Sequence, residues 1–86
     1  MGSRLVGIQL VIELLGCETS ILEHTDKVQN VMESAALTVS PTIINSVFHQ
    51  FNPFGVSGVV VIEGGHLAIH TWPEYNYAAV DLFVGV

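Results

Sequence analysis

The sequence predicts an α+β fold, a two-layer α/β sandwich in which one helix covers one face of a mainly antiparallel sheet. Two observations favour this class. A single segment with helical periodicity follows one alternating segment, and a series of short segments rich in β-branched residues, separated by glycine and proline, comes after it. The expected order along the chain is β-α-β-β-β-β. The 86 residues contain no linker, repeat or low-complexity stretch, so we expect one domain over residues 1–86 with a modest core.

The first expected strand runs from Leu5 to Leu14, where apolar residues alternate with other residues. Gln9 and Glu13 lie on the opposite side from the apolar set, so the pattern predicts a strand with one buried face. Gly16 ends this segment. The apolar set is Val6, Ile8, Leu10, Ile12 and Leu14.

A helix is expected over Ser20–Leu37. Ser20 followed three residues later by Glu23 has the form of a capping box, and Ser40-Pro41 ends the helical region. The apolar residues at helical spacing are Ile21, Leu22, Val28, Val31, Met32, Ala35 and Ala36, with Thr25 in the same stripe.

Four further strands are expected. Asn-Pro and a following glycine predict a turn in the first connection, and Gly64-Gly65 suits a two-residue hairpin turn because glycine takes positive φ without steric cost. A Trp72-Pro73 bend precedes the last strand. The expected strands are 42–48, 57–63, 66–71 and 77–84, with the first turn over Phe51–Gly55.

The composition is apolar for a small chain, with 50% hydrophobic residues, a mean hydropathy of +0.58 and only 12% charged residues. We expect part of this apolar surface to face another subunit in a homodimer or larger homo-oligomer. No apolar run approaches the roughly 18 residues that a membrane span requires, and Met1–Arg4 is too short for a signal peptide's basic region. The sequence therefore predicts no membrane partner and a cytoplasmic location.

The charge balance is acidic. Arg4 and Lys27 stand against eight acidic residues, which gives a formal net charge of −6. Nucleic-acid binding requires clustered cations, so we expect no nucleic-acid partner and favour a cationic small molecule. Cys17 is the only cysteine, which excludes an intramolecular disulfide and a cysteine-based zinc site, and we expect it to be a small buried residue.

Two cofactor hypotheses are weak on the residues themselves. His66 and His70, with His49, suggest a metal site, but positions i and i+4 on a strand lie roughly 13 Å apart, too far to chelate one ion. Lys27 as a pyridoxal-phosphate lysine lies on the expected exposed helix face with no phosphate cradle. We therefore expect no metal.

Two long strings carry a family resemblance, FGVSGVVVI at 54–62 and HLAIHTWPEY at 66–75. They resemble the core of bacterial and archaeal S-adenosylmethionine decarboxylases. Three flanking strings agree, and the likeness covers about Leu5 to Phe83. The flanking strings are Gly16-Cys17, Phe48-His49-Gln50-Phe51 and Tyr77-Ala78-Ala79-Val80-Asp81-Leu82-Phe83.

The resemblance implies a dimeric α/β sandwich that decarboxylates S-adenosylmethionine and so supplies the aminopropyl donor for spermidine. In that family a serine that follows a glutamate attacks the preceding carbonyl, and the ester that forms eliminates to leave an N-terminal pyruvoyl group. The pyruvoyl ketone forms a Schiff base with the substrate amine and serves as the electron sink.

Three departures from the family pattern follow. Gly64-Gly65 occupies the place of Glu-Ser, so Gly65 stands where the pyruvoyl serine is expected, and Ser57, eight positions upstream, is no replacement. Gly85 stands where the family carries its catalytic acid cysteine. The chain also lacks the further helix and strand of family members, which predicts a truncated domain. We expect no self-derived pyruvoyl cofactor in this chain.

The ligand-contacting positions of the family are present. Phe51 matches the phenylalanine that stacks on adenine, and Glu74 matches the glutamate that hydrogen-bonds the ribose hydroxyls. Ser57 and His70 match residues that assist self-cleavage, a role that is lost without the nucleophile, although His70 could still contact the carboxylate of a bound sulfonium ligand. From the residues alone, Phe51 also fits a core position and Glu74 a solvated loop carboxylate. Ser57 also fits a hydroxyl bonded to backbone, and His70 a strand histidine satisfied by a neighbour.

Three functions remain open at this point. The first is a catalytically impaired homologue that binds S-adenosylmethionine, its decarboxylated product or a polyamine, and regulates an active paralogue through mixed dimers. The second is a structural, oligomerising or engineered variant of the fold without a ligand site. The third is a working decarboxylase with a cofactor from another source.

Overall fold

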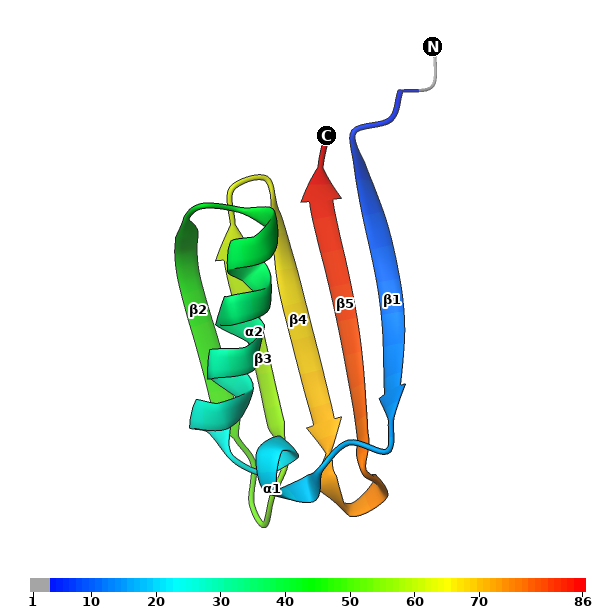
Figure 1. Cartoon of the computed structure of the whole chain (residues 1–86), viewed down its shortest axis with the longest axis vertical. Coiled ribbons are helices and arrows are strands. Elements are labelled where there is room, and N and C mark those ends of the chain that lie inside the picture. Colours follow the sequence, from blue (N-terminus) through cyan, green and yellow to red (C-terminus); the bar gives the residue numbers. More distant parts are fainter. Residues whose placement is uncertain (1–3) are drawn as a thin grey trace.

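The computed structural model describes residues 4–86 and forms a five-stranded sheet with its helices on one face (Figure 1). The strand order is β1-β5-β4-β3-β2, and every neighbouring pair is antiparallel. This confirms the expected α+β sandwich and its order along the chain. The elements are β1 (Gly7–Leu15), α1 (Thr19–Leu22), α2 (Thr25–Val39), β2 (Ile43–Gln50), β3 (Val56–Ile62), β4 (Gly65–Trp72), the 3₁₀ helix η1 (Pro73–Tyr75) and β5 (Tyr77–Gly85).

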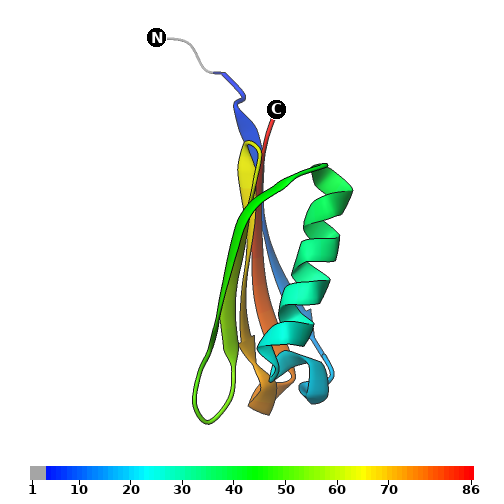
Figure 2. The same cartoon turned by 90° about the vertical axis from the view of Figure 1, so that its left-hand side faces the viewer.

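The helix α2 lies over β2, β3 and β4, and the opposite face of the sheet, here called the open face, carries no helix within residues 4–86 (Figure 2). Strand side chains alternate between these two faces. The core lies under α2, where Val28, Met32 and Ala36 meet Val56 and Val60 of β3. Burying an aliphatic side chain of this kind contributes roughly 1.5 to 3 kcal/mol. The core therefore fixes β3 and β4, the two strands that carry the quoted motifs.

Gly58 explains how β2 and β3 fit together. A Cβ atom at Gly58 would lie 2.0 Å from Cδ2 of Phe48, which pairs with Gly58 on the neighbouring strand. The ring of Phe48 therefore occupies the space that a side chain at position 58 would fill. An aromatic ring over a strand glycine restores the packing that the missing side chain would give.

The expected continuous helix over Ser20–Leu37 is wrong. The chain breaks at Glu23-His24, and the residues that flank the two helices as N-caps are Glu18 and His24, so Ser20 is not a cap and the capping box is absent. The reason is tertiary, because the Thr25 backbone N–H donates to Gln50 Oε1 at 3.1 Å and the Thr25 hydroxyl donates to the same oxygen at 2.8 Å. A side chain of β2 thus satisfies the first turn of α2.

The expected Gly64-Gly65 turn is shifted by one residue. The turn residues are Glu63 and Gly64, and only Gly64 has positive φ, at +75°. Gly65 pairs with Ile62 and begins β4. The hairpin therefore needs glycine at position 64 because the φ there is positive. The φ at position 65 is not positive, so the backbone conformation does not require glycine there.

The expected buried face of the first strand is also wrong. β1 is an edge strand, and all its residues after Gly7 are exposed on both faces. Ile8, Leu10, Ile12 and Leu14 point to the α2 side, but α2 lies over the other half of the sheet (Figure 1).

Among residues 4–86, no helix is long and apolar enough to cross a membrane. Part of the expectation for Met1–Arg4 concerns Met1 to Ser3, which lie outside the described residues.

Candidate functional site

Three polar side chains form a row on the open face near the loop between β2 and β3. Ser57 pairs in register with His49 on one side and with His70 on the other. Ser57 Oγ and His70 Nδ1 are 2.7 Å apart, within hydrogen-bond distance. The interpretation of Ser57 as a hydroxyl bonded to backbone is therefore wrong, and His70 finds its partner in Ser57.

The loop between β2 and β3 is held in a closed shape. The Phe51 N–H donates to the Gly55 carbonyl at 2.8 Å, and Gln50 Nε2 donates to the same oxygen at 3.1 Å. Gly55 has φ +111°, a conformation that L side chains rarely adopt. The rings of His49 and Phe51 pack edge to face with centroids 4.5 Å apart. The turn predicted over Phe51–Gly55 is thus present, and it presents the Phe51 ring beside the Ser57 row.

Glu74 reaches the same region from the 3₁₀ helix after β4. The turn ends at Asn76, whose φ of +52° lies in the left-handed region. Asn76 Nδ2 donates to the Cys17 carbonyl at 2.9 Å and to Thr19 Oγ1 at 2.8 Å, which ties η1 to the start of α1. Cys17 itself is half-buried and packs against the core.

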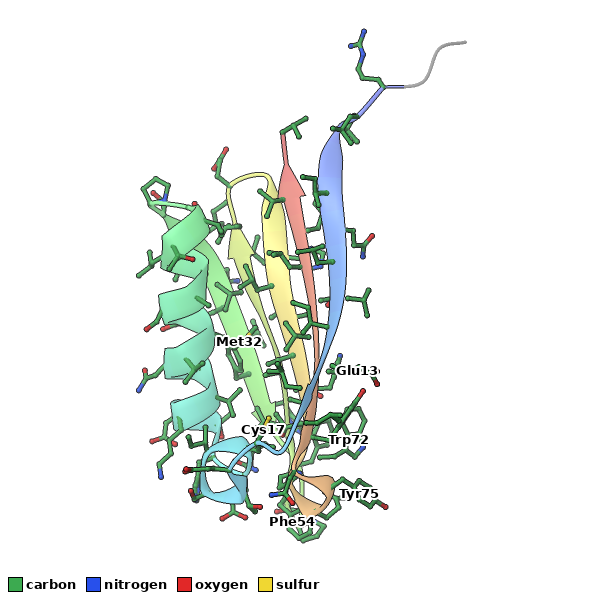
Figure 3. All side chains as sticks on the ribbon, turned by 45° about the vertical axis from the view of Figure 1, so that its right-hand side comes forward. Glu13, Cys17, Met32, Phe54, Trp72 and Tyr75 are labelled. Atoms are coloured by element: carbon green, nitrogen blue, oxygen red, sulfur yellow. The ribbon has the colours of Figure 1, made fainter. Side chains whose placement is uncertain are left out.

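These elements surround one cavity of about 480 Å³, which we call the loop cavity. Figure 3 shows Phe54, Trp72 and Tyr75 gathered at the same end of the molecule. All four residues matched to the family's ligand and assisting positions line the loop cavity, so the structure brings them together. The lining is Phe51, Asn52, Pro53, Phe54, Gly55, Ser57, His70, Thr71, Trp72 and Glu74.

The loop cavity suits a ligand with an aromatic and a polar part. Phe51, Phe54 and Trp72 are 47%, 40% and 41% exposed, large fractions for aromatic residues, and their rings offer faces for stacking. The carboxylate of Glu74 is exposed and can accept hydrogen bonds from ligand hydroxyls or attract a cation.

Gly65 and Gly85 form a separate cluster at the other end of the sheet. The Gly85 N–H donates to the Gly64 carbonyl at 2.9 Å. A Cβ atom at Gly65 would lie 2.0 Å from the Phe83 carbonyl oxygen, and one at Gly85 would lie 3.0 Å from the Gly64 oxygen. Backbone atoms cannot yield as a flexible side chain does, so position 65 holds no side chain in this hairpin.

The two clusters are far apart in one chain. Gly65 and His70 are five residues apart on β4, which corresponds to about 16 Å, and their parity places them on opposite faces of the sheet. In a single chain Ser57 and His70 therefore cannot act on the peptide bond before residue 65.

Two cross-strand side-chain pairs were not predicted from the sequence. Tyr77 donates to Glu13 Oε2 at 2.6 Å, and this hydrogen bond raises the pKa of Tyr77 above its ordinary value of 10.0. His66 Nε2 lies 3.3 Å from Asp81 Oδ2. Both pairs join residues that face each other diagonally, and only the strand register reveals them.

In the described part of the chain, no three His, Cys, Asp or Glu side chains gather as a metal site. Lys27 is exposed on α2.

Comparisons with known proteins identify the family. The family profile described as S-adenosylmethionine decarboxylase matches residues 8–85. Relatives named S-adenosylmethionine decarboxylase proenzyme occur in Thermosipho africanus, 51% identical over 78 residues, and in Thermodesulfovibrio yellowstonii, 54% identical over 78 residues. These matches cover 91% of this chain but 60% and 58% of the two relatives, so the chain spans less than two thirds of their length.

A solved structure agrees with these matches. The adenosylmethionine decarboxylase from Aquifex aeolicus superimposes with a TM-score of 0.86 at 29% identity, covering 98% of this chain and 69% of that one. The family profile, the relatives and the shared fold lead to one conclusion: the chain belongs to the S-adenosylmethionine decarboxylase family.

Proposed function

We propose that this chain binds S-adenosylmethionine, or a close adenosyl sulfonium such as its decarboxylated product, in the loop cavity, and that it does not make its own pyruvoyl group. The observation that carries the proposal is the convergence of Phe51, Ser57, His70 and Glu74 on one cavity. A role in polyamine (spermidine) biosynthesis, which the family resemblance implies, is part of this proposal.

The binding chemistry follows from the lining. The adenine ring stacks on the half-exposed Phe51 ring, an interaction worth about 1 to 3 kcal/mol per base in other proteins. Glu74 accepts hydrogen bonds from the ribose hydroxyls. The sulfonium is a cation, and a chain with a net charge of −6 attracts it. His70 contacts the ligand carboxylate while its Nδ1 stays with Ser57.

Self-processing is not part of the proposal, because the residues present do not fit a pyruvoyl group. That group derives from a serine, and position 65 is a glycine. The space that its side chain would need is filled by the Phe83 carbonyl. The proposed function of this chain therefore includes no decarboxylation step.

We also propose that two copies associate through the open face. Val11 is 79% exposed and Leu15 is 79% exposed at the β1 side of this face, and Val47 is 60% exposed at the β2 side. Exposed apolar patches of this kind mark association surfaces. The loop cavity lies at one end of the sheet and Gly65 at the other, so a two-fold axis perpendicular to the strands would bring the loop cavity of one copy toward the Gly65 end of its partner.

Calorimetric titration with S-adenosylmethionine tests the binding proposal. We expect saturable heat that disappears in Phe51→Ala and persists in Tyr75→Ala, since Tyr75 is an exposed aromatic residue at the same end that does not line the loop cavity. Methionine, which lacks the adenosine, is the ligand control. The absence of heat at millimolar S-adenosylmethionine would overturn the proposal and favour a purely structural role.

Two further measurements test the absence of self-processing and the association of two copies. Intact mass is expected to show one uncut chain of 9.3 kDa. Two fragments that sum to this mass, with a carbonyl group on the downstream one, would contradict the absence of self-processing. Light scattering at micromolar concentration is expected to show a dimer, and a monomer would contradict the open-face association.

A further inference from the structure

The loop cavity has an unbalanced set of charges. Among the described residues that line it, Glu74 is the one carboxylate, and none is a lysine or arginine. The other lining residues are aromatic rings, small residues and neutral hydrogen-bonding groups, together with His70. The loop cavity therefore offers a negative charge to a ligand and no permanent positive charge.

Both basic side chains of the chain lie away from the loop cavity. Lys27 is exposed on α2, which packs on the face of the sheet opposite the open face (Figure 2). Arg4 precedes Gly7, the first residue of β1, whereas the loop cavity lies at the end of the sheet where β1 ends at Leu15. Positions 7 and 15 are about 27 Å apart along a strand, well beyond the screening length of salt solutions. Neither cation of this copy can pair with an anion in the loop cavity.

The neutral polar groups of the loop cavity offer few hydrogen bonds to a ligand carboxylate. His70 Nδ1 lies 2.7 Å from Ser57 Oγ, so a neutral His70 ring has at most one N–H left for a ligand. The Thr71 hydroxyl already bonds to two backbone groups, one of α1 and one of β3. Hydrogen bonds without a cation are about half as strong as charge-assisted ones. A ligand carboxylate in the loop cavity is therefore poorly paired, and Glu74 repels it.

Positive groups of a ligand find better partners there. The half-exposed rings of Phe51, Phe54 and Trp72 present aromatic faces to the loop cavity. An aromatic face attracts a cation that lies within about 6 Å of the ring centre. The Glu74 carboxylate can pair with an ammonium group. The same lining that disfavours a carboxylate thus favours a sulfonium and an amine.

We propose that the loop cavity prefers an adenosyl sulfonium that carries an amine but no carboxylate, namely decarboxylated S-adenosylmethionine, over S-adenosylmethionine itself. This inference rests on the proposed adenosyl site. At pH 7 S-adenosylmethionine carries a sulfonium, an ammonium and a carboxylate, whereas its decarboxylated form carries the two positive charges alone. Both ligands present the same adenosine to Phe51 and Glu74, so the carboxylate decides the difference. Such a chain holds the product of the family's reaction in preference to its substrate.

The proposed pairing of two copies does not change this balance. It would bring the Gly65 end of a second copy toward the loop cavity, and Arg4 lies at that end of the sheet. Glu63 lies in the turn at the same end and is exposed. The two opposite charges bring no net positive charge to the loop cavity, so the preference holds in the dimer as well.

Calorimetric titration at pH 7 with three ligands tests the preference. The ligands are S-adenosylmethionine, its decarboxylated form and the neutral thioether 5′-methylthioadenosine, which keeps the adenosine and lacks both the sulfonium and the amino acid. We expect all three to bind, with the decarboxylated form tighter than S-adenosylmethionine by at least about tenfold. It should also bind more tightly than the neutral thioether, because the thioether carries no positive charge.

Matched variants locate the cause in the loop cavity. Asn52→Lys adds a cation to the lining and is expected to shift the ratio of the two sulfonium affinities about tenfold toward S-adenosylmethionine. Tyr75→Lys adds the same charge at the same end of the molecule but outside the lining, and it should leave the ratio nearly unchanged. Glu74→Gln should weaken both sulfonium ligands through the ribose contact, and the decarboxylated form more.

Each unfavourable result has its own meaning. If none of the three ligands binds, the adenosyl site of the proposed function fails as well. If all three bind and S-adenosylmethionine is as tight as its decarboxylated form, the adenosyl site stands and the preference is wrong. Equal shifts in Asn52→Lys and Tyr75→Lys would assign the preference to net charge and not to the lining. Weaker binding of S-adenosylmethionine alone in Arg4→Gln would show that a second copy supplies a cation, which also overturns the inference.

Discussion

Thr71 offers the sharpest test of how the structure is held together. Its side chain is 6% exposed and joins three elements. The Thr71 hydroxyl donates to the Leu22 carbonyl at the end of α1 and accepts from the Val56 N–H at the start of β3, both at 2.8 Å. The Thr71 hydroxyl oxygen on β4 thus holds the end of α1 against the sheet. It also holds the first residue of β3, the strand that carries Ser57.

The magnitude can be worked from these two bonds. Thr71→Val keeps the shape but leaves a buried carbonyl and a buried N–H without partners, and each costs about 1 to 3 kcal/mol. Some relaxation toward water lowers the sum, so we expect a loss of about 2 to 4 kcal/mol in the free energy of unfolding. A domain of 86 residues has a total of roughly 4 to 13 kcal/mol. Thr71→Ser keeps the hydroxyl and loses one methyl group, which costs about 1 kcal/mol.

The assay is urea unfolding followed by the fluorescence of Trp72, the only tryptophan. The expected order of stability is wild type, then Thr71→Ser, then Thr71→Val by a clear margin. The two hydrogen bonds do not stabilise the fold as described if the free energy of unfolding of Thr71→Val lies within about 0.5 kcal/mol of the wild-type value. The same conclusion follows if Thr71→Ser is as unstable as Thr71→Val.

Two other predictions concern the sheet. Gly58→Ala places a Cβ atom where the Phe48 ring lies and should cost about 1 to 3 kcal/mol by urea unfolding, but much less in a Phe48→Ala background; equal costs in both backgrounds would contradict the packing. The Tyr77 pKa is raised by the hydrogen bond to Glu13, so the neutral phenol stabilises the fold below about pH 10, and this contribution disappears as the pH rises through the raised pKa. In a Tyr75→Phe background, Glu13→Gln should lower the Tyr77 pKa in an ultraviolet alkaline titration, and an unchanged titration curve would show that the Glu13 contact does not set that pKa.

The sequence by itself determined the fold class, the strands and the family. Alternation and β-branched composition placed five strands within a few residues of their observed bounds, because both signals are local. The two long strings at 54–62 and 66–75 carried the family resemblance, and the comparisons confirmed it. Phe51 and Glu74 could be named from matching positions, although nothing local distinguishes them from a core aromatic and a surface carboxylate.

Only the tertiary structure decided the features that depend on distant partners. Gln50 of β2 accepts hydrogen bonds from the first residue of α2, and the position of α2 over β2 to β4 leaves the aliphatic row of β1 uncovered among the residues that the structure describes. The register of β3 and β4 places Ser57 against His70 and separates both from Gly65 by about 16 Å. Periodicity reports which residues share a face of one element, but it contains no information on which other element covers that face. That choice is made by packing between segments far apart in the chain, so it appears only in the folded molecule.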